Sequence, residues 1–245
     1  MATYILIHGS WHGGWCFDPL RQRLELAGHS VIAPDLPGMG GTPAELAAVT
    51  LAGWADFVAD LCRNAARPVV LLGHSRGGLV ISEAAERVPD RIDALVYLCA
   101  MMLPDGMSRA QFKLQEGPNP AFDALITPVA DGHATRIVGD GAPVFAQLSP
   151  PELVGPAMAR LVDEPHGPRS TPLRLTTERF GRVPRVYIEC TDDRTIPISS
   201  QRRMQALVPG ARVETLWADH SPYLSRPEAV AGILLNLPEV VLQAV

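Results

Sequence analysis

The chain has 245 residues, of which 47% are hydrophobic and 19% are charged, and its formal net charge is −5. This length suits one compact domain with room for an insertion, and the composition is ordinary for a folded protein of enzyme size. The negative charge and the lack of a basic run argue against nucleic acid or an anionic membrane as partners.

The cysteines and the N-terminal residues bear on the compartment. Four cysteines (Cys16, Cys62, Cys99 and Cys190) are scattered without CxxC or Cys/His spacing. We therefore expect buried free thiols in a reducing compartment and neither disulfides nor a zinc site. The first residues have no basic n-region and too short an apolar run for a signal peptide, and the longest apolar stretch, residues 95–103, is too short to span a bilayer. These features predict a cytoplasmic protein.

Short apolar runs alternate with longer amphipathic segments. Six runs predict strands buried on both faces: residues 4–7, 31–33, 69–72, 94–98, 186–188 and 213–216. Helices are predicted over about 19–27, 50–66, 75–88, 199–207 and 227–235, with Thr50 as an N-cap and Gly28 as a C-cap. The alternation predicts an α/β fold with a mostly parallel sheet of about six strands and helices on both faces.

Residues 103–182 break this rhythm because they are rich in Pro and Gly and show only weak helical patterns. The stretch is too long for a connecting loop, so we expect a small cap, with residues 1–102 and 183–245 forming the core. Its apolar side chains and those just before it could line a pocket or form the core of the cap itself: Met101, Met102, Leu103, Phe112, Phe122, Phe145, Leu148 and Met158.

Three loops that follow predicted strands carry a serine, a pair of aspartates and a histidine. Ligands of parallel sheets bind at the carboxyl ends of the strands, so Ser75, Asp192-Asp193 and His220 are expected to meet there. A serine hydroxyl needs a base to become a nucleophile, and a carboxylate can hold a histidine in the basic tautomer. Glycines flank Ser75 in the segment 73–78, as a sharp strand-to-helix turn requires. We predict that Ser75 is a nucleophile; the alternative is a helix N-cap serine.

Five segments carry a resemblance to a known family: residues 4–15 (YILIHGSWHGGW), 27–36 (AGHSVIAPDL), 70–78 (VLLGHSRGG), 186–197 (VYIECTDDRTIP) and 218–221 (ADHS). The chain resembles α/β-hydrolases, and in particular the plant methylesterases and hydroxynitrile lyases with their bacterial esterase relatives. The match covers about the first hundred and the last sixty residues, whereas the cap matches poorly. The resemblance implies the α/β-hydrolase fold and a serine carboxylesterase that cleaves a small ester through an acyl-enzyme. It implies no metal or organic cofactor, and a homodimer stays open.

The resemblance also assigns site residues. In the family pattern the triad acid lies four residues before the proline that begins the next helix, which favours Asp193 over Asp192; Asp105 is a third candidate. The base is His220, the one histidine in the loop after the last strand. The oxyanion donors implied are the backbone N–H groups of Ser10 and Arg76.

The remaining histidines receive structural interpretations. We expect His8 and His74 to hold loops together by hydrogen bonds and His12 to serve in packing. No role is assigned to His29, His133 or His166.

Other activities remain as alternatives. The related hydroxynitrile lyases carry a threonine after the histidine of the first loop and a lysine after the catalytic histidine, whereas this chain has Gly9 and Ser221. This favours hydrolysis, although Arg76 could bring a cation from another direction. A thioesterase or cyclase using the same acyl-enzyme, and a ligand binder without catalysis, also stay open. Aspartate-nucleophile members of the fold are disfavoured because a serine occupies position 75.

Arg76 is unusual because its cation lies at the N-terminus of a helix, where the dipole disfavours positive charge. One hypothesis is an ion pair with a nearby carboxylate, for example from the cap. The other is that Arg76 binds a carboxylate or another polar group of the substrate.

Overall fold

The central sheet has six strands, all parallel. The computed structural model describes residues 1–237, so residues 238–245 of the predicted core lie outside the described part. In sheet order the strands are β2 (Ser30–Ile32), β1 (Thr3–Ile7), β3 (Val69–His74), β4 (Ala94–Leu98), β8 (Arg185–Cys190) and β9 (Arg212–Leu216). This is the α/β-type arrangement predicted from the alternation of strands and helices.

Two of the six strands differ from the prediction. The residues of β1, β3 and β4 are buried throughout, as expected for strands covered on both faces. The predicted burial is wrong for β2 and β9, whose residues are partly or largely exposed. Both are edge strands that pair with only one neighbour, so helices cover them incompletely.

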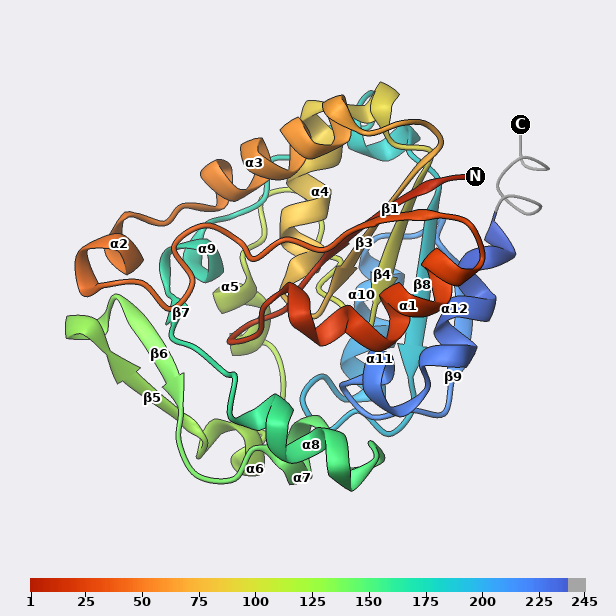
Figure 1. Ribbon diagram of the computed structural model, residues 1–245. Coiled ribbons are helices and arrows are strands. Elements are labelled where there is room, and N and C mark those ends of the chain that lie inside the picture. The colour runs from red at the N-terminus through yellow and green to blue at the C-terminus, as the bar shows by residue number, and fades with distance from the viewer. Residues whose placement is uncertain (238–245) are drawn as a thin grey trace.

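Helices cover both faces of the sheet (Figure 1). One face packs against α1 (Asp18–Leu26), α11 (Pro222–Ser225) and α12 (Pro227–Leu235). The other packs against α3 (Leu51–Asn64), α4 (Gly77–Arg87) and α10 (Ile198–Leu207). Single-turn 3-10 helices lie at Gly14–Phe17, Pro89–Arg91, Ala130–Gly132 and Phe180–Arg182.

The predicted helix boundaries hold where capping signals are strong. Thr50 accepts a hydrogen bond from Gly53 N at 3.0 Å and begins α3, and α1 ends shortly before Gly28, whose φ is +84°. The helix α2 (Pro43–Ala48) was not predicted, although Thr42 and Glu45 form a reciprocal capping box at its start.

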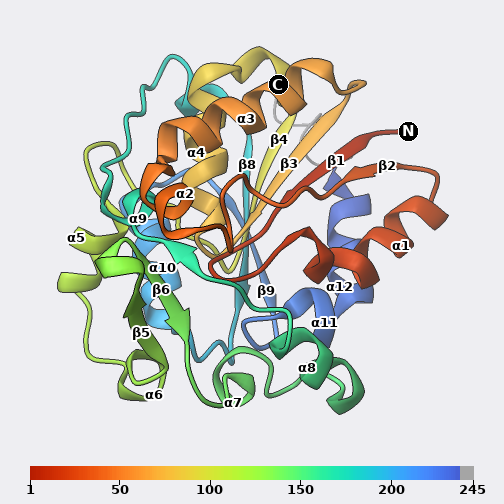
Figure 2. The ribbon, with the colours of Figure 1, turned by 60° about the vertical axis from the view of Figure 1, so that its left-hand side comes forward.

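The segment between β4 and β8 holds short elements that lie beside the carboxyl ends of the central strands (Figure 2). They are α5 (Arg109–Leu114), α6 (Pro120–Asp123), β5 (Ile126–Val129), β6 (Ala134–Ile137), α7 (Ala142–Phe145), α8 (Pro151–Met158), β7 (Glu164–Pro165) and α9 (Gly167–Ser170). The strands β5, β6 and β7 form a small antiparallel sheet. We call residues 103–182 the cap.

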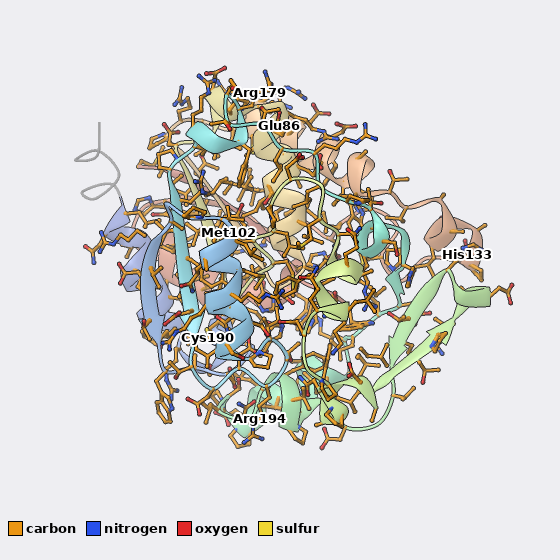
Figure 3. The ribbon with its side chains drawn as sticks, turned by 180° about the vertical axis from the view of Figure 1, so that it is seen from behind. Glu86, Met102, His133, Arg179, Cys190 and Arg194 are labelled. Atoms are coloured by element: carbon orange, nitrogen blue, oxygen red, sulfur yellow. The ribbon has the colours of Figure 1, made fainter. Side chains whose placement is uncertain are left out.

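The last part of the cap sequence returns along the core. Thr176 donates its N–H to Glu86 Oε2 at 2.8 Å, and Arg179 donates to the carbonyls of Glu86 and Arg87 (Figure 3). These contacts tie the return segment to α4, the helix that follows Ser75.

Two further sequence expectations concern cysteines and membranes. The four cysteines are free and buried, as predicted. No helix among residues 1–237 has the length and apolarity needed to cross a bilayer. The cytoplasmic location stays a prediction.

Candidate active site

Ser75 lies on a sharp turn between β3 and α4. Its φ of +52° is in the left-handed region that few non-glycine residues adopt, and its carbonyl accepts a hydrogen bond from Met101 N at 2.8 Å. A Cβ on Gly77 would lie 2.5 Å from the carbonyl oxygen of Ile7, and one on Gly78 would lie 2.4 Å from that of Met101. The turn therefore needs glycine at both positions and holds the serine in one orientation.

The three residue types predicted from the strand-end loops meet at the carboxyl ends of β3, β8 and β9. His220 Nε2 lies 3.0 Å from Ser75 Oγ, and His220 Nδ1 lies 2.7 Å from Asp193 Oδ2. Since the carboxylate accepts from Nδ1, the lone pair on Nε2 faces the serine hydroxyl. This geometry can remove the hydroxyl proton as the oxygen attacks.

In the loop after β8, which we call the acid loop (residues 191–197), Asp193 differs in its contacts from the two other carboxylates considered as the triad acid. Asp193 is buried, and its Oδ1 accepts the N–H groups of Thr195 at 2.7 Å and Ile196 at 2.8 Å. Asp192 is exposed and accepts from the hydroxyl of Thr191, while Asp105 is exposed and accepts from Leu175 N. Only Asp193 of the three contacts His220 among the described residues.

The predicted oxyanion donors are free to bind a ligand. In the part of the chain that the structure describes, the backbone N–H groups of Ser10 and Arg76 donate to no protein acceptor. Ser10 follows β1, and Arg76 follows the nucleophile at the start of α4. Two unpaired N–H groups beside a nucleophile can stabilise a developing oxyanion.

The Arg76 side chain is buried in an ion pair with the cap. Its Nε lies 2.7 Å from Glu164 Oε1, its Nη2 donates to Gly9 O at 3.0 Å, and its guanidinium stacks on Trp54. Glu164 also accepts from Ser10 Oγ and Trp11 N at 3.1 Å each. The ion-pair hypothesis is confirmed. Nη1 of Arg76 is buried without a hydrogen-bond partner, but Glu164 already balances the charge of the guanidinium, which argues against Arg76 as the group that binds an anionic substrate.

Three histidines around the site are buried. His8 donates from Nδ1 to Gly9 O and accepts from Leu36 N at Nε2, and burial lowers its pKa to about 3. His12 donates to Ser10 O and stacks on Trp15; burial lowers its pKa to about 4. His74 donates to the carbonyl of His220 at 2.8 Å, and burial lowers its pKa far below the ordinary value. The structural roles expected for these side chains agree with these contacts.

The buried histidines predict loss of stability in acid. Their folded-state pKa values lie below the unfolded value of about 6.5, so the unfolded chain binds more protons between about pH 6.5 and pH 4. The free energy of unfolding should fall with pH through this window, by about 2 kcal/mol per histidine at pH 5. Urea titrations at pH 7 and pH 5 measure the loss. The loss of unfolding free energy between pH 7 and pH 5 should be about 2 kcal/mol smaller in His12→Phe than in the wild type. Equal losses in the two proteins would contradict the low pKa of His12.

One group of potential metal ligands lies in the described residues. Ligand atoms of His74, Cys99 and His220 lie within 4.8 Å of one another. The His220 nitrogens contact Asp193 and Ser75, and His74 Nε2 donates to a carbonyl. Metal binding would take the His220 nitrogens away from Ser75 and Asp193. The contacts of His220 therefore fit the Ser–His–Asp arrangement better than a metal centre.

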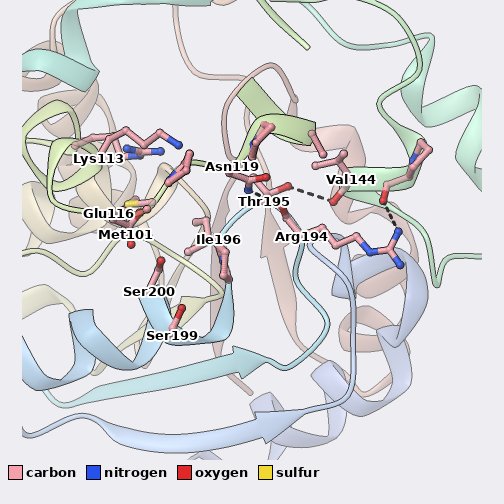
Figure 4. A pocket seen from close by; sticks show the side chains of 17 residues that line it. Met101, Lys113, Glu116, Asn119, Val144, Arg194, Thr195, Ile196, Ser199 and Ser200 are labelled. Carbon is pink, nitrogen blue, oxygen red and sulfur yellow. Dashed lines mark hydrogen bonds between the residues drawn. The ribbon is translucent and has the colours of Figure 1, made fainter. Parts of the chain in front are cut away.

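The site opens into the space between the cap and the acid loop (Figure 4). A cavity of about 560 Å³ is lined by residues from α5, α6, α7 and the segment 194–200. A smaller cavity of about 30 Å³ lies at Ser75, Ser10 and Arg76. Both are lined by Met101, Arg109, Thr195 and Ile196, so they adjoin. Of the apolar residues considered for a pocket, Met101 and Phe122 line these cavities, and Phe112 is part of the core.

Comparison with known proteins agrees with this arrangement. Residues 4–233 match the model of the alpha/beta hydrolase family. The chain belongs to this family. It is similar to the pyrethroid hydrolase of Sphingobium wenxiniae (37% identical, covering 98% of this chain and 88% of that protein) and to salicylic acid-binding protein 2 of Nicotiana tabacum (32%, covering 96% of each). A solved pyrethroid hydrolase from Sphingobium faniae superposes on this alpha/beta hydrolase with a TM-score of 0.87 at 34% identity, covering 97% of each chain.

Some residues of this alpha/beta hydrolase that support the site were not predicted. Asp219 is buried beside His220, and its carboxylate accepts from Leu148 N at 2.8 Å and from Ser149 Oγ at 3.1 Å. Glu164 joins the cap to the nucleophile turn through Arg76. Asp219 directly precedes His220 in the segment 218–221, a position that could have pointed to it, whereas Glu164 lies in the cap, where the sequence shows no local pattern.

Proposed function

We propose that this chain hydrolyses a small carboxylic ester through an acyl-enzyme formed on Ser75. The protein is a carboxylic ester hydrolase, in keeping with the esterases and hydrolases among its relatives. The observation that carries the proposal is the unbroken contact chain from Ser75 Oγ through His220 to Asp193, with the serine fixed in its left-handed turn.

In the first half of the proposed reaction Ser75 Oγ attacks the ester carbonyl carbon while His220 Nε2 takes its proton. The resulting oxyanion accepts hydrogen bonds from the N–H groups of Ser10 and Arg76. His220 then gives the proton to the departing alcohol, and the acyl group stays on Ser75.

In the second half a water molecule attacks the acyl carbon, and His220 takes one of its protons. Collapse of the second tetrahedral intermediate returns that proton to Ser75 Oγ and releases the carboxylic acid. Asp193 keeps the imidazole in one tautomer throughout and stabilises the imidazolium that forms twice per turnover.

Position 9 supports hydrolysis over the hydroxynitrile lyase alternative. A Cβ on Gly9 would lie 2.7 Å from Ser75 Cβ, so a threonine there would displace the nucleophile. Position 221 holds a buried serine whose Oγ lies 3.3 Å from Tyr223 Oη, and it supplies no cation.

We expect Gly9→Thr to lose ester hydrolysis by at least about 100-fold without gaining lyase activity, because Ser75 would leave hydrogen-bond distance of His220. Hydrolysis of 4-nitrophenyl acetate and benzaldehyde release from mandelonitrile measure the two activities. The control is Gly232→Thr, at a partly exposed glycine of α12 that lies outside both cavities and whose Cβ would meet no atom within 4 Å. Near-wild-type hydrolysis by Gly9→Thr would contradict the steric argument.

The proposal itself is tested by the same two substrates with the wild-type protein. Turnover of the aryl ester without release of benzaldehyde is the expected result, whereas benzaldehyde release without ester turnover would favour the lyase. Pyrethroid and methyl esters are the natural next substrates, because similar proteins are a pyrethroid hydrolase and methylesterases.

A further inference from the structure

Two arginines at the candidate active site have no carboxylate partner. Arg109, the first residue of α5, and Arg169, in α9, both line the cavity at Ser75 together with Arg76. Within residues 1–237 no carboxylate forms an ion pair with Arg109 or Arg169, and their side chains make no hydrogen bond to the protein. The neighbouring cations differ in this respect, because Lys113 pairs with Asp123 and Arg194 donates to Pro143 O.

The charges at this place are unbalanced. Of the three guanidinium groups at this cavity, only that of Arg76 forms an ion pair within residues 1–237, with Glu164. Glu116 and Asp123 lie near enough to Arg109 to raise its pKa but form no ion pair with it. Burial and the neighbouring Arg169 lower the pKa of Arg109 to about 10, so it is still a cation at neutral pH. Burial lowers the pKa of Arg76 as well; Glu164 opposes this effect and Arg169 adds to it. Like charges placed together in a partly desolvated site repel one another, and an anion bound between them would relieve that repulsion.

The polar atoms of Arg109 are also left unsatisfied. Its side chain is only partly exposed, and its Nη1 is buried with no hydrogen-bond partner. A buried donor without an acceptor costs free energy, so such groups in a folded protein commonly meet a water or a ligand. The planar guanidinium matches the two oxygens of a carboxylate.

Arg109 stands where the two cavities adjoin. It lines the small cavity at Ser75 and also the adjoining cavity of about 560 Å³, which is large enough for the rest of a small ester. The helices α5 and α9 pack against each other, which brings Arg169 to the same side (Figure 2). An anionic group that a short carbon chain links to the scissile ester would therefore contact both guanidinium groups.

We propose that Arg109 and Arg169 form an anion-binding subsite for a free carboxylate of the ester substrate. The inference rests on the proposed function, since it names the substrate class of that site: half-esters of small dicarboxylic acids and similar esters that keep one ionised carboxylate. Arg76 contributes its backbone N–H to the reaction, while its side chain remains paired with Glu164.

The test compares two esters of equal length, monomethyl glutarate and methyl pentanoate, which differ by a carboxylate in place of a methyl group. The wild-type protein should show a kcat/KM at least about tenfold higher for monomethyl glutarate, as a charge-assisted pair predicts. Arg109→Gln and Arg169→Gln should each lower the ratio of the two kcat/KM values by about tenfold or more, mainly through KM, and Arg109→Lys should restore part of it. The control Arg136→Gln removes the same charge from an exposed position of the cap outside both cavities and should keep the wild-type ratio.

Direct binding separates failure of the subsite from failure of the proposed function. Calorimetry of the two intact esters with Ser75→Ala should show tighter binding of monomethyl glutarate than of methyl pentanoate, and adding Arg109→Gln should abolish the difference. One outcome overturns the subsite but leaves the proposed function in place. In it the wild-type protein hydrolyses methyl pentanoate, and the arginine variants lower kcat/KM by the same factor for both esters. Equal binding of the two esters to Ser75→Ala would also overturn it, because the arginines would then not distinguish a carboxylate from a methyl group.

Discussion

Ser75→Ala should lower kcat for 4-nitrophenyl acetate by a factor on the order of 10^5 to 10^6, because it removes the attacking oxygen and leaves His220 with nothing to deprotonate. The substitution keeps Cβ, so the left-handed turn and its packing should persist. We expect a Tm within about 3 °C of the wild type and unchanged circular dichroism. Stopped assays of the purified variant measure the residual rate.

A matched control distinguishes loss of the nucleophile from local damage. Ser82, on α4 below the turn, is buried and has its hydroxyl 2.7 Å from Tyr97 Oη, away from His220. Ser82→Ala should reduce stability by about 1 kcal/mol through the lost hydrogen bond and keep most of the activity. Turnover by Ser75→Ala within about tenfold of the wild type would exclude Ser75 as the nucleophile.

Asp193→Asn is expected to lower kcat by a factor on the order of 10^4. The asparagine oxygen can still accept from Thr195 N, but its NH₂ group would face His220 Nδ1 and donate to it. The imidazole proton would then lie on Nε2, and the ring could no longer accept the proton of Ser75. The measurement is the pH dependence of kcat from pH 6 to 9. It shows whether the loss in Asp193→Asn becomes smaller as the hydroxide concentration rises.

The neighbouring aspartate supplies the control for this prediction. Asp192→Asn changes the net charge by the same amount one residue away, but its side chain is exposed and contacts Thr191 instead of His220. It should keep kcat within about threefold of the wild type. A larger loss in Asp192→Asn than in Asp193→Asn would reverse the assignment of the triad acid.

Much of the core could be predicted from the sequence because local patterns decide it. The central strands are uninterrupted apolar runs, and the glycines around Ser75 meet steric limits set by Ile7 and Met101. The error lay in β2 and β9. The segment of β2 is a short apolar run like those of the central strands, and strand order, which sequence patterns do not contain, places it at an edge. In β9 the polar residues Glu214 and Thr215 interrupt the apolar ones, and the prediction of burial on both faces overlooked them. The preference for Asp193 came from the family pattern, a four-residue spacing to Pro197, and in the structure its Oδ1 accepts the N–H groups of Thr195 and Ile196 within that turn.

The cap could not be predicted in the same way. Its links to the site join residues far apart in the chain: Glu164 contacts Ser10 across 154 positions, and Leu148 contacts Asp219 across 71. No periodicity in residues 103–182 indicates these partners. For the same reason the sequence could not decide between the two hypotheses about Arg76, because its partner Glu164 lies in the cap.

The central claim is that Ser75 carries the acyl group during turnover. Acid quenching of the wild-type protein within the first turnover of 4-nitrophenyl acetate, followed by peptide mass spectrometry, tests it most directly. We expect one acetyl group on the peptide that contains Ser75, at the serine oxygen, and none in Ser75→Ala. Continued hydrolysis with no acetyl group on Ser75, or with the group on another residue, would contradict it.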